Sequence, residues 1–283
     1  MAQQTSTMIV KASGDYAPLD IRKLERSVRH VGASKSLARG VAQDVARDVR
    51  DGMTTRQIHA LVLRALRQRR ERSTEVRYSL KEAMRRLGPA GYDFEHYVAA
   101  VLRAHGYDAY LPPLMPGMAV EHEVDVIARK GSMTAMVEAK YRNAPGIYVR
   151  LKDIMATWAR YEDLREAYRH GKHTTKLTAC WVVCNTKVTG DGIAFGEYKG
   201  MRIIGWEYPK GAGLQQLVIE KHLYPVTVLR SVSTVMRTAF ANAGLIVCHD
   251  IAGMPTRELM TRTGLSQQAI DRVQREVAAT LPC

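Results

Sequence analysis

The sequence predicts an α/β protein with a mostly helical N-terminal part, a central mixed sheet flanked by helices, and a small helical C-terminal region. Three observations support this fold class. Apolar residues recur at helical spacing through most of residues 1–88. Short apolar runs of strand length alternate with helical stretches across residues 91–225, an order typical of a partly parallel sheet. Residues 226–283 return to helical periodicity, so we expect three domains with these bounds.

Length and composition narrow the class of protein. The chain has 283 residues, of which 46% are hydrophobic, enough to build real cores. No stretch approaches the roughly 18 consecutive apolar residues of a membrane span, and the first residues lack the pattern of a secretory signal. We therefore expect a cytoplasmic protein with no membrane partner. Four cysteines are too few for a disulfide framework, and we expect Cys180 and Cys184 to pack as small hydrophobes on one strand face.

Positive charge is concentrated in the N-terminal part. The net charge is +14 and the pI is near 9.8. Residues 1–90 hold 19 Lys and Arg against 9 Asp and Glu, a net +10, whereas residues 91–283 hold 23 against 19, a net +4. An excess of this size indicates a polyanionic partner, and nucleic acid is the commonest one in a cytoplasm. The alternative is a solvated basic helical surface without a partner.

Turn residues, caps and apolar stripes define the N-terminal elements. Residues 7–20 predict a short strand, a turn centred on Gly14 and a second extended piece. Thr54 or Thr55 is a suitable cap for the third of the helices that follow, and two glycines and a proline at residues 88–91 indicate a linker. The four predicted helices lie at residues 20–32, 36–52, 54–70 and 73–88.

The central part begins with a helix at residues 92–108, which Asp93 can cap, and a short strand at residues 109–113. A hairpin at residues 121–141 turns near Gly131. Helix and strand then alternate at residues 148–168, 177–186, 190–200 and 201–208. The C-terminal part shows helical periodicity at residues 226–244, 255–264 and 266–281.

The hairpin carries charged residues where a strand pair is usually packed. Glu138 and Lys140 are two apart on the second strand and therefore project from the same face. With the turn near Gly131, Asp125 lies nearly opposite residues 136–137, so its carboxylate is a diagonal neighbour of Glu138. Two adjacent carboxylates repel each other unless a proton or a cation lies between them.

A hard divalent cation with oxygen ligands, most naturally Mg²⁺, resolves this conflict. Lys140 beside the carboxylates fits a group that orients a water or stabilises charge on a phosphate oxygen. Glu95 on the preceding helix can add a carboxylate, and Glu121 and Glu123 share the strand face of Asp125 as further candidates. The alternative, from spacing alone, is a solvated hairpin with cross-strand ion pairs.

Residues 91–110 and 121–141 (GYDFEHYVAAVLRAHGYDAY and EHEVDVIARKGSMTAMVEAKY) resemble the PD-(D/E)xK restriction-endonuclease-like superfamily, in its Mrr-like branch. Residues 181–206 are similar to the strand–helix–strand that closes that catalytic core. The resemblance covers roughly residues 91–225 and implies Mg²⁺-dependent hydrolysis of DNA phosphodiesters. The proline of the family's name is replaced here by Val124.

Site residues follow from this resemblance. It implies that Asp125 and Glu138 are the metal ligands and that Lys140 positions and polarises the attacking water. Glu95 would be the helix carboxylate that supports the site. The presence of Asp, Glu and Lys together favours an active site over an inactive nuclease fold.

Residues 8–88 resemble the ATP-cone, a nucleotide-binding regulatory domain best known from ribonucleotide reductases and their repressor. The likeness rests on residues 10–28 (VKASGDYAPLDIRKLERSV) and 54–66 (TTRQIHALVLRAL), although the family has Arg where this chain has Ala12. It implies ATP or dATP as a regulatory ligand, with Thr55 at a helix N-terminus adding a hydroxyl and free N–H groups. The alternative is a domain that has lost its ligand and serves as a basic DNA-binding or dimerising module. The implied nucleotide contacts are Val10, Lys11, Asp20, Lys23, Thr55 and His59.

The C-terminal stretch 254–281 predicts two helices joined at residues 263–265, with Ser266 as the cap of the second. It loosely resembles helix-hairpin-helix modules, which hold the DNA backbone with loop N–H groups and helix N-termini. The alternative for its arginines, Arg257, Arg262 and Arg272, is an ordinary solvated face.

These features together predict a Mg²⁺-dependent DNA endonuclease regulated by ATP or dATP, and we expect it to form homo-oligomers. A second hypothesis is a nucleotide-responsive DNA-binding regulator with an inactive nuclease fold. A third hypothesis, a kinase or ATPase, is disfavoured because the sequence has no phosphate loop of the G-x-x-x-x-G-K type.

Overall fold

The computed structural model describes residues 7–11, 13–88 and 94–282, and it separates into two compact units, Met1–Leu80 and Lys81–Cys283. The predicted α/β fold class is confirmed. Ala12, Asp93 and most of the expected linker lie outside the described residues. Within the described ranges, no helix is both long enough and apolar enough to cross a bilayer.

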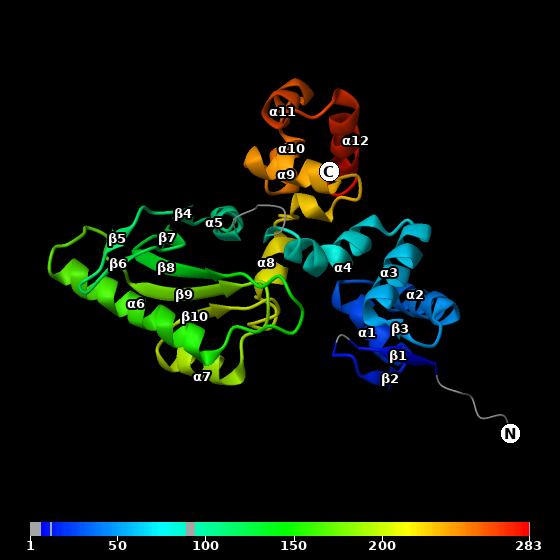
Figure 1. Cartoon of the computed structure of the whole chain (residues 1–283), viewed down its shortest axis with the longest axis horizontal. Coiled ribbons are helices and arrows are strands. Elements are labelled where there is room, and N and C mark those ends of the chain that lie inside the picture. The colour runs from blue at the N-terminus through cyan, green and yellow to red at the C-terminus, as the bar shows by residue number, and fades with distance from the viewer. Residues whose placement is uncertain (1–6, 12, 89–93, 283) are drawn as a thin grey trace. The chain divides into compact units, whose positions relative to one another are not determined.

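The N-terminal unit combines a small sheet with helices (Figure 1). Its central strand β1 (Met8–Val10) runs antiparallel to β2 (Tyr16–Pro18) and parallel to β3 (Met53–Thr54). The parallel strand β3 was not predicted, because two residues are too few to show a strand pattern. The helices are α1 (Ile21–His30), α2 (Lys35–Asp48), α3 (Thr55–Gln68) and α4 (Arg72–Arg85), and the boundary between the units falls within α4.

The first three helices begin where the sequence provides a cap. The side chains of Asp20 and Ser34 accept backbone N–H groups at the starts of α1 and α2. Thr54 forms a capping box with Gln57, so the cap of α3 is Thr54 and Thr55 is the first helical residue. The apolar stripes of these helices meet in one core, whose most buried members include Val28, Val41, Val45, Val62 and Leu66.

The second unit is built on a five-stranded sheet with the strand order β10-β9-β8-β7-β4. Strands β4, β7 and β8 are antiparallel neighbours, whereas β8, β9 and β10 run parallel, as expected for a mixed sheet. The predicted turn is confirmed, since Lys130 pairs with Met133 around Gly131, whose φ is 58°. The strands are β4 (Asp108–Tyr110), β7 (Val126–Lys130), β8 (Met133–Lys140), β9 (Ala179–Cys184) and β10 (Arg202–Ile204).

Helices pack against this sheet (Figure 1). Helix α6 (Leu151–Arg169) contacts β9 and α7 (Gly190–Tyr198), whereas α5 (Phe94–Ala104) contacts β4, β7 and β8. Because side chains alternate along a strand, the face of β8 that meets α6 also carries Glu138 and Lys140. The core on this face includes Ile127, Met136, Val182, Ile154 and Leu164.

The predicted strand at the start of the hairpin is not continuous. Residues 121–122 form β6 (Glu121–His122), which pairs with β5 (Met115–Pro116) in a separate two-stranded sheet. The five-stranded sheet is rejoined only at Val126, after the buried Val124. The sequence could not show this break, because the partner strand β5 is only two residues long.

The C-terminal elements differ from the prediction in two places. The expected helix at residues 226–244 is instead a 3₁₀ turn (Val226–Val228) followed by α9 (Thr234–Asn242), because Ser233 caps a new helix. The short helix α10 (Cys248–Ala252) was not predicted. Helix α8 (Leu214–Glu220), which precedes this region, was not predicted either. The remaining helices are α11 (Thr256–Thr263) and α12 (Gln267–Ala278). Residues 81–283 form one compact unit, so the division at residue 226 stays a prediction.

Candidate active site

The charged residues of the hairpin meet at one end of the strand pair β7–β8. Val126 pairs with Val137, so Asp125, immediately before β7, lies opposite Glu138 itself. The sequence predicted a diagonal relation, which is wrong because the turn is centred on Gly131 and Ser132, slightly further along the chain than the expected position near Lys130 and Gly131. Glu138 and Lys140 do share a face, since Lys140 Nζ donates to Glu138 Oε1.

Hydrogen bonds fix both carboxylates. Asp125 Oδ2 accepts the backbone N–H of Ala139 at 2.7 Å, which holds the Asp125 carboxylate against β8. Glu138 is only 4% exposed and bonds through both oxygens, to Lys140 and to Arg160. A solvated hairpin with exposed ion pairs is therefore the wrong description of Glu138. A buried carboxylate of this kind is costly unless it is paired.

The pKa of Asp125 records the crowding of negative charge. Its pKa is raised from 3.8 to about 6, mainly by burial and next by the nearby charge of Glu138. The Ala139 N–H and the Lys140 ammonium oppose the increase, while Glu95 adds to it. The Asp125 carboxyl group therefore holds a proton to a higher pH than an ordinary aspartate does.

Glu95 lies in the first turn of α5, and its charge acts on Asp125. The topology explains this proximity. β4 follows α5 and pairs antiparallel with the far end of β7, so α5 runs back along β7 and its first turn lies near the Asp125 end. The other two acidic candidates are not brought together in this way, because Glu121 belongs to the separate β5–β6 sheet and Glu123 precedes the return of the chain to β7.

Arg160 is a member of the site that the sequence did not reveal. It projects from α6, and its Nη1 lies 2.5 Å from Glu138 Oε2. The only available indication was its position on the helix after the Glu-x-Lys strand, directly before the buried Tyr161. A basic residue next to the buried stripe of that helix is close enough to reach the strand face it covers.

The end of β8 is fixed by two further residues. Tyr141, which follows Lys140, donates its hydroxyl to the carbonyl of Arg85 at 2.5 Å and accepts the N–H of Gly88 at 3.2 Å. The buried Asn185 bonds both the N–H and the carbonyl of Arg142, at 2.8 and 2.9 Å. The strand that carries Glu138 and Lys140 therefore ends at a rigid position.

The donor chemistry of the site fits Mg²⁺. Two facing carboxylates, one with its pKa raised to about 6, form the environment that a hard dication relieves. Among the residues that the structure describes, no group of three or more His, Cys, Asp or Glu side chains could hold a metal. Mg²⁺ is often held by only one or two carboxylates, with water and substrate phosphate completing its shell. Asp125 and Glu138 would be the protein ligands.

The expected nucleotide residues lie at two ends of the small N-terminal sheet. Val10 pairs with Thr54, which places the exposed Lys11 near Thr55 at the start of α3. At the other end, the Leu19 N–H bonds the carbonyl of Thr7, and α1 begins there. The pairing thus brings together Val10, Lys11 and Thr55, whereas Asp20 and Lys23 form a second group in the first turn of α1.

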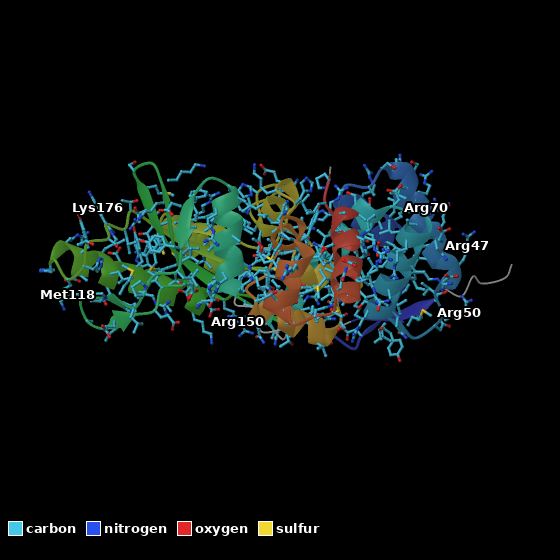
Figure 2. All side chains as sticks on the ribbon, turned by 90° about the horizontal axis from the view of Figure 1, so that it is seen from above. Arg47, Arg50, Arg70, Met118, Arg150 and Lys176 are labelled. Atoms are coloured by element: carbon cyan, nitrogen blue, oxygen red, sulfur yellow. The ribbon has the colours of Figure 1, made fainter. Side chains whose placement is uncertain are left out.

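His59 is one helical turn beyond Thr55 and stacks on the ring of Tyr78, with centroids 5.0 Å apart. Basic residues surround the same unit, and Arg47, Arg50 and Arg70 point outward from it (Figure 2). The pattern agrees with the basic excess of residues 1–90. It also leaves cationic side chains available to a polyanion.

The C-terminal turn has the predicted form. Gly264 adopts a left-handed conformation with a φ of 67°, and the Ser266 side chain caps α12 by accepting the Ala269 N–H. Arg262 is engaged within the fold, because its guanidinium donates to the carbonyl of Ala243. This arginine is therefore not a freely solvated side chain.

Comparisons with known proteins place the chain in a family. A family model described as AF1548-like, C-terminal matches residues 224–281. An uncharacterised protein of Archaeoglobus fulgidus is 32% identical over 179 residues, which are 63% of this chain and 97% of that protein. A solved structure, the crystal structure of the protein of unknown function AF1548, has a TM-score of 0.56 and 32% identity, and the match covers 65% of this chain and 94% of that one. The chain therefore belongs to the AF1548-like family.

Proposed function

We propose that the protein is a Mg²⁺-dependent DNA endonuclease of the PD-(D/E)xK type, regulated by ATP or dATP bound to the N-terminal unit. The observation that carries the proposal is the pairing of Asp125 with Glu138 on adjacent strands, with Lys140 on the same face and Glu95 nearby. The raised pKa of Asp125 supports the proposal, because strongly perturbed pKa values cluster at functional sites.

Each side chain has a defined task in this mechanism. Mg²⁺, when bound by Asp125 and Glu138, would lower the pKa of a water and stabilise charge on the phosphate. Lys140 forms an ion pair with Glu138, and its ammonium group can orient the attacking water and stabilise charge on a phosphate oxygen. Glu95 adds negative charge beside Asp125 and so supports the binding of a dication.

The first test is nicking of supercoiled plasmid DNA with Mg²⁺, with EDTA as the control. Lys140→Ala should reduce the rate at least about 100-fold, since one charge-stabilising group is lost, while the fold and DNA binding are retained. Binding is measured in Ca²⁺ and folding by circular dichroism. Full activity of Lys140→Ala would show that Lys140 has no part in the mechanism. Wild-type protein that does not cleave DNA would refute the proposed nuclease activity.

Regulation by nucleotide is tested in the same assay with and without ATP and dATP. The resemblance to the ATP-cone, the basic excess of this unit and the grouping of Lys11 with Thr55 support a phosphate-bearing ligand. A thermal shift with ATP reports binding independently of cleavage. We further expect a homo-oligomer that acts in the cytoplasm, where both DNA and nucleotide are present.

The second candidate is a nucleotide-responsive DNA-binding regulator that does not cleave. It is favoured by one observation, that both oxygens of Glu138 are already bonded to cationic side chains. Such a carboxylate is satisfied without a metal. The two candidates differ in a single measurement, because the regulator binds DNA without Mg²⁺-dependent nicking.

A further inference from the structure

We propose that Arg160 is a substrate-binding residue of this site, which pairs with Glu138 in the substrate-free protein and moves to a DNA phosphate when a divalent cation occupies Glu138. This role rests on the proposed nuclease function. It adds a residue that the Asp-Glu-Lys pattern does not contain, and it orders the events at the site.

The geometry leaves the guanidinium accessible while the carboxylate is enclosed. Arg160 Nη1 lies 2.5 Å from Glu138 Oε2, yet the Arg160 side chain is 31% exposed and that of Glu138 only 6%. Helix α6 holds the base of the arginine in place, since Ile154, Tyr161 and Leu164 are buried against the sheet. The free part of the side chain can therefore turn toward solvent without movement of the helix.

The charges show why the pair is not permanent. Two cationic groups, Lys140 and Arg160, share one carboxylate, while Asp125 and Glu95 crowd the same place with negative charge. A dication between Asp125 and Glu138 would add positive charge a few ångströms from the guanidinium and weaken its attraction to Glu138. Arginine cannot lose its proton in compensation, so its charge must find another anion.

A DNA phosphate is the anion best suited to that charge. The guanidinium binds phosphate oxygens through two parallel hydrogen bonds, which a single ammonium cannot do. The phosphate that reaches the carboxylate pair also arrives within the range of a side chain already anchored beside Glu138. The cation and Arg160 therefore compete for the Glu138 carboxylate, but both would bind the DNA phosphate.

This competition gives opposite effects on metal and on DNA, which a merely structural ion pair would not give. Arg160→Ala should lower the half-saturating Ca²⁺ concentration about 10-fold, because the competing charge is gone. In Ca²⁺ it should weaken binding of a short DNA duplex about 10-fold, and in Mg²⁺ it should slow plasmid cleavage about 100-fold. Arg160→Lys keeps the positive charge, so its half-saturating Ca²⁺ concentration should equal that of the wild type, whereas its cleavage should remain slow.

The experiment uses the full chain, with Ca²⁺ binding read from thermal shift titrations. Arg165→Ala is the matched control, since Arg165 lies on the same helix, is 34% exposed and pairs with Glu162 at 2.9 Å; it should behave like wild type. An unchanged Ca²⁺ midpoint or undiminished DNA binding in Arg160→Ala would overturn the role of Arg160. If that variant fails to fold, Arg160→Lys decides, and wild-type cleavage by it overturns the role. Wild-type protein without any Ca²⁺ response would instead refute the metal site itself.

Discussion

At the scale of single residues, Asp125 makes stability depend on pH. Its pKa is about 6 in the folded protein against an ordinary 3.8, so the folded form keeps a proton that the unfolded chain has lost between these values. Stability therefore falls as the pH rises through this window. Asp125→Asn should stabilise the protein by about 1–2 kcal/mol at about pH 7.5, after allowance for solvent screening, and hardly at all near pH 4. Urea denaturation at the two pH values measures this, and an equal effect at both would contradict it.

The site residues that could be predicted from the sequence are brought together differently from Arg160, which could not be predicted. Asp125, Glu138 and Lys140 lie on one hairpin. The alternation of side chains along a strand and the position of the turn are therefore enough to predict that they lie close together. Arg160 joins from a helix 22 residues after Glu138, and its contact depends on how α6 rotates against the sheet. That rotation is set by the buried stripe as a whole, not by any local pattern.

At the scale of elements, the β5–β6 hairpin depends on a glycine. Asp163 of α6 accepts the Ala119 N–H at 2.9 Å and bonds His122 Nε2 at 2.7 Å, which ties the hairpin to the helix. A methyl group at Gly117 would overlap both Asp163 Oδ2 and the backbone carbonyl oxygen of Val120. Gly117→Ala should therefore cost about 2 kcal/mol in thermal or urea unfolding. Gly190→Ala, at an open position on α7, is the control and should be nearly neutral. An equal loss of stability in both variants would show that close packing around Gly117 is not required.

Elements that were predicted correctly carry their own local evidence. The capped helices α1, α2 and α3 each have a polar N-cap and an apolar stripe, and the buried strand β9 is apolar throughout. The elements that were not predicted are short, and contacts with other parts of the chain stabilise them. β5 and β6 have two residues each, and α10 has five, so no periodic pattern is long enough to identify them.

At the scale of the whole molecule, the division into units is not visible in local periodicity. The pattern of α4 runs unbroken through residues 73–88, and we expected the first domain to include all of it. The structure ends the first compact unit at Leu80, within the helix. The second half of α4 belongs to the second unit because it contacts residues far along the chain. Thr227 Oγ1, for example, donates to the carbonyl of Ala83 at 2.7 Å.

This assignment predicts where the chain can be cut. Met84 and Leu87 are fully buried, and Tyr141 bonds the carbonyl of Arg85 at 2.5 Å, so residues 81–87 belong to the core of the second unit. A chain that starts at residue 89 should be less stable than one that starts at Arg72 by at least about 4 kcal/mol, because two buried side chains and their hydrogen bonds are lost. Urea denaturation of the two truncated chains measures the difference. Equal stability would mean that α4 contributes nothing to the second unit, and the unit would then begin at α5.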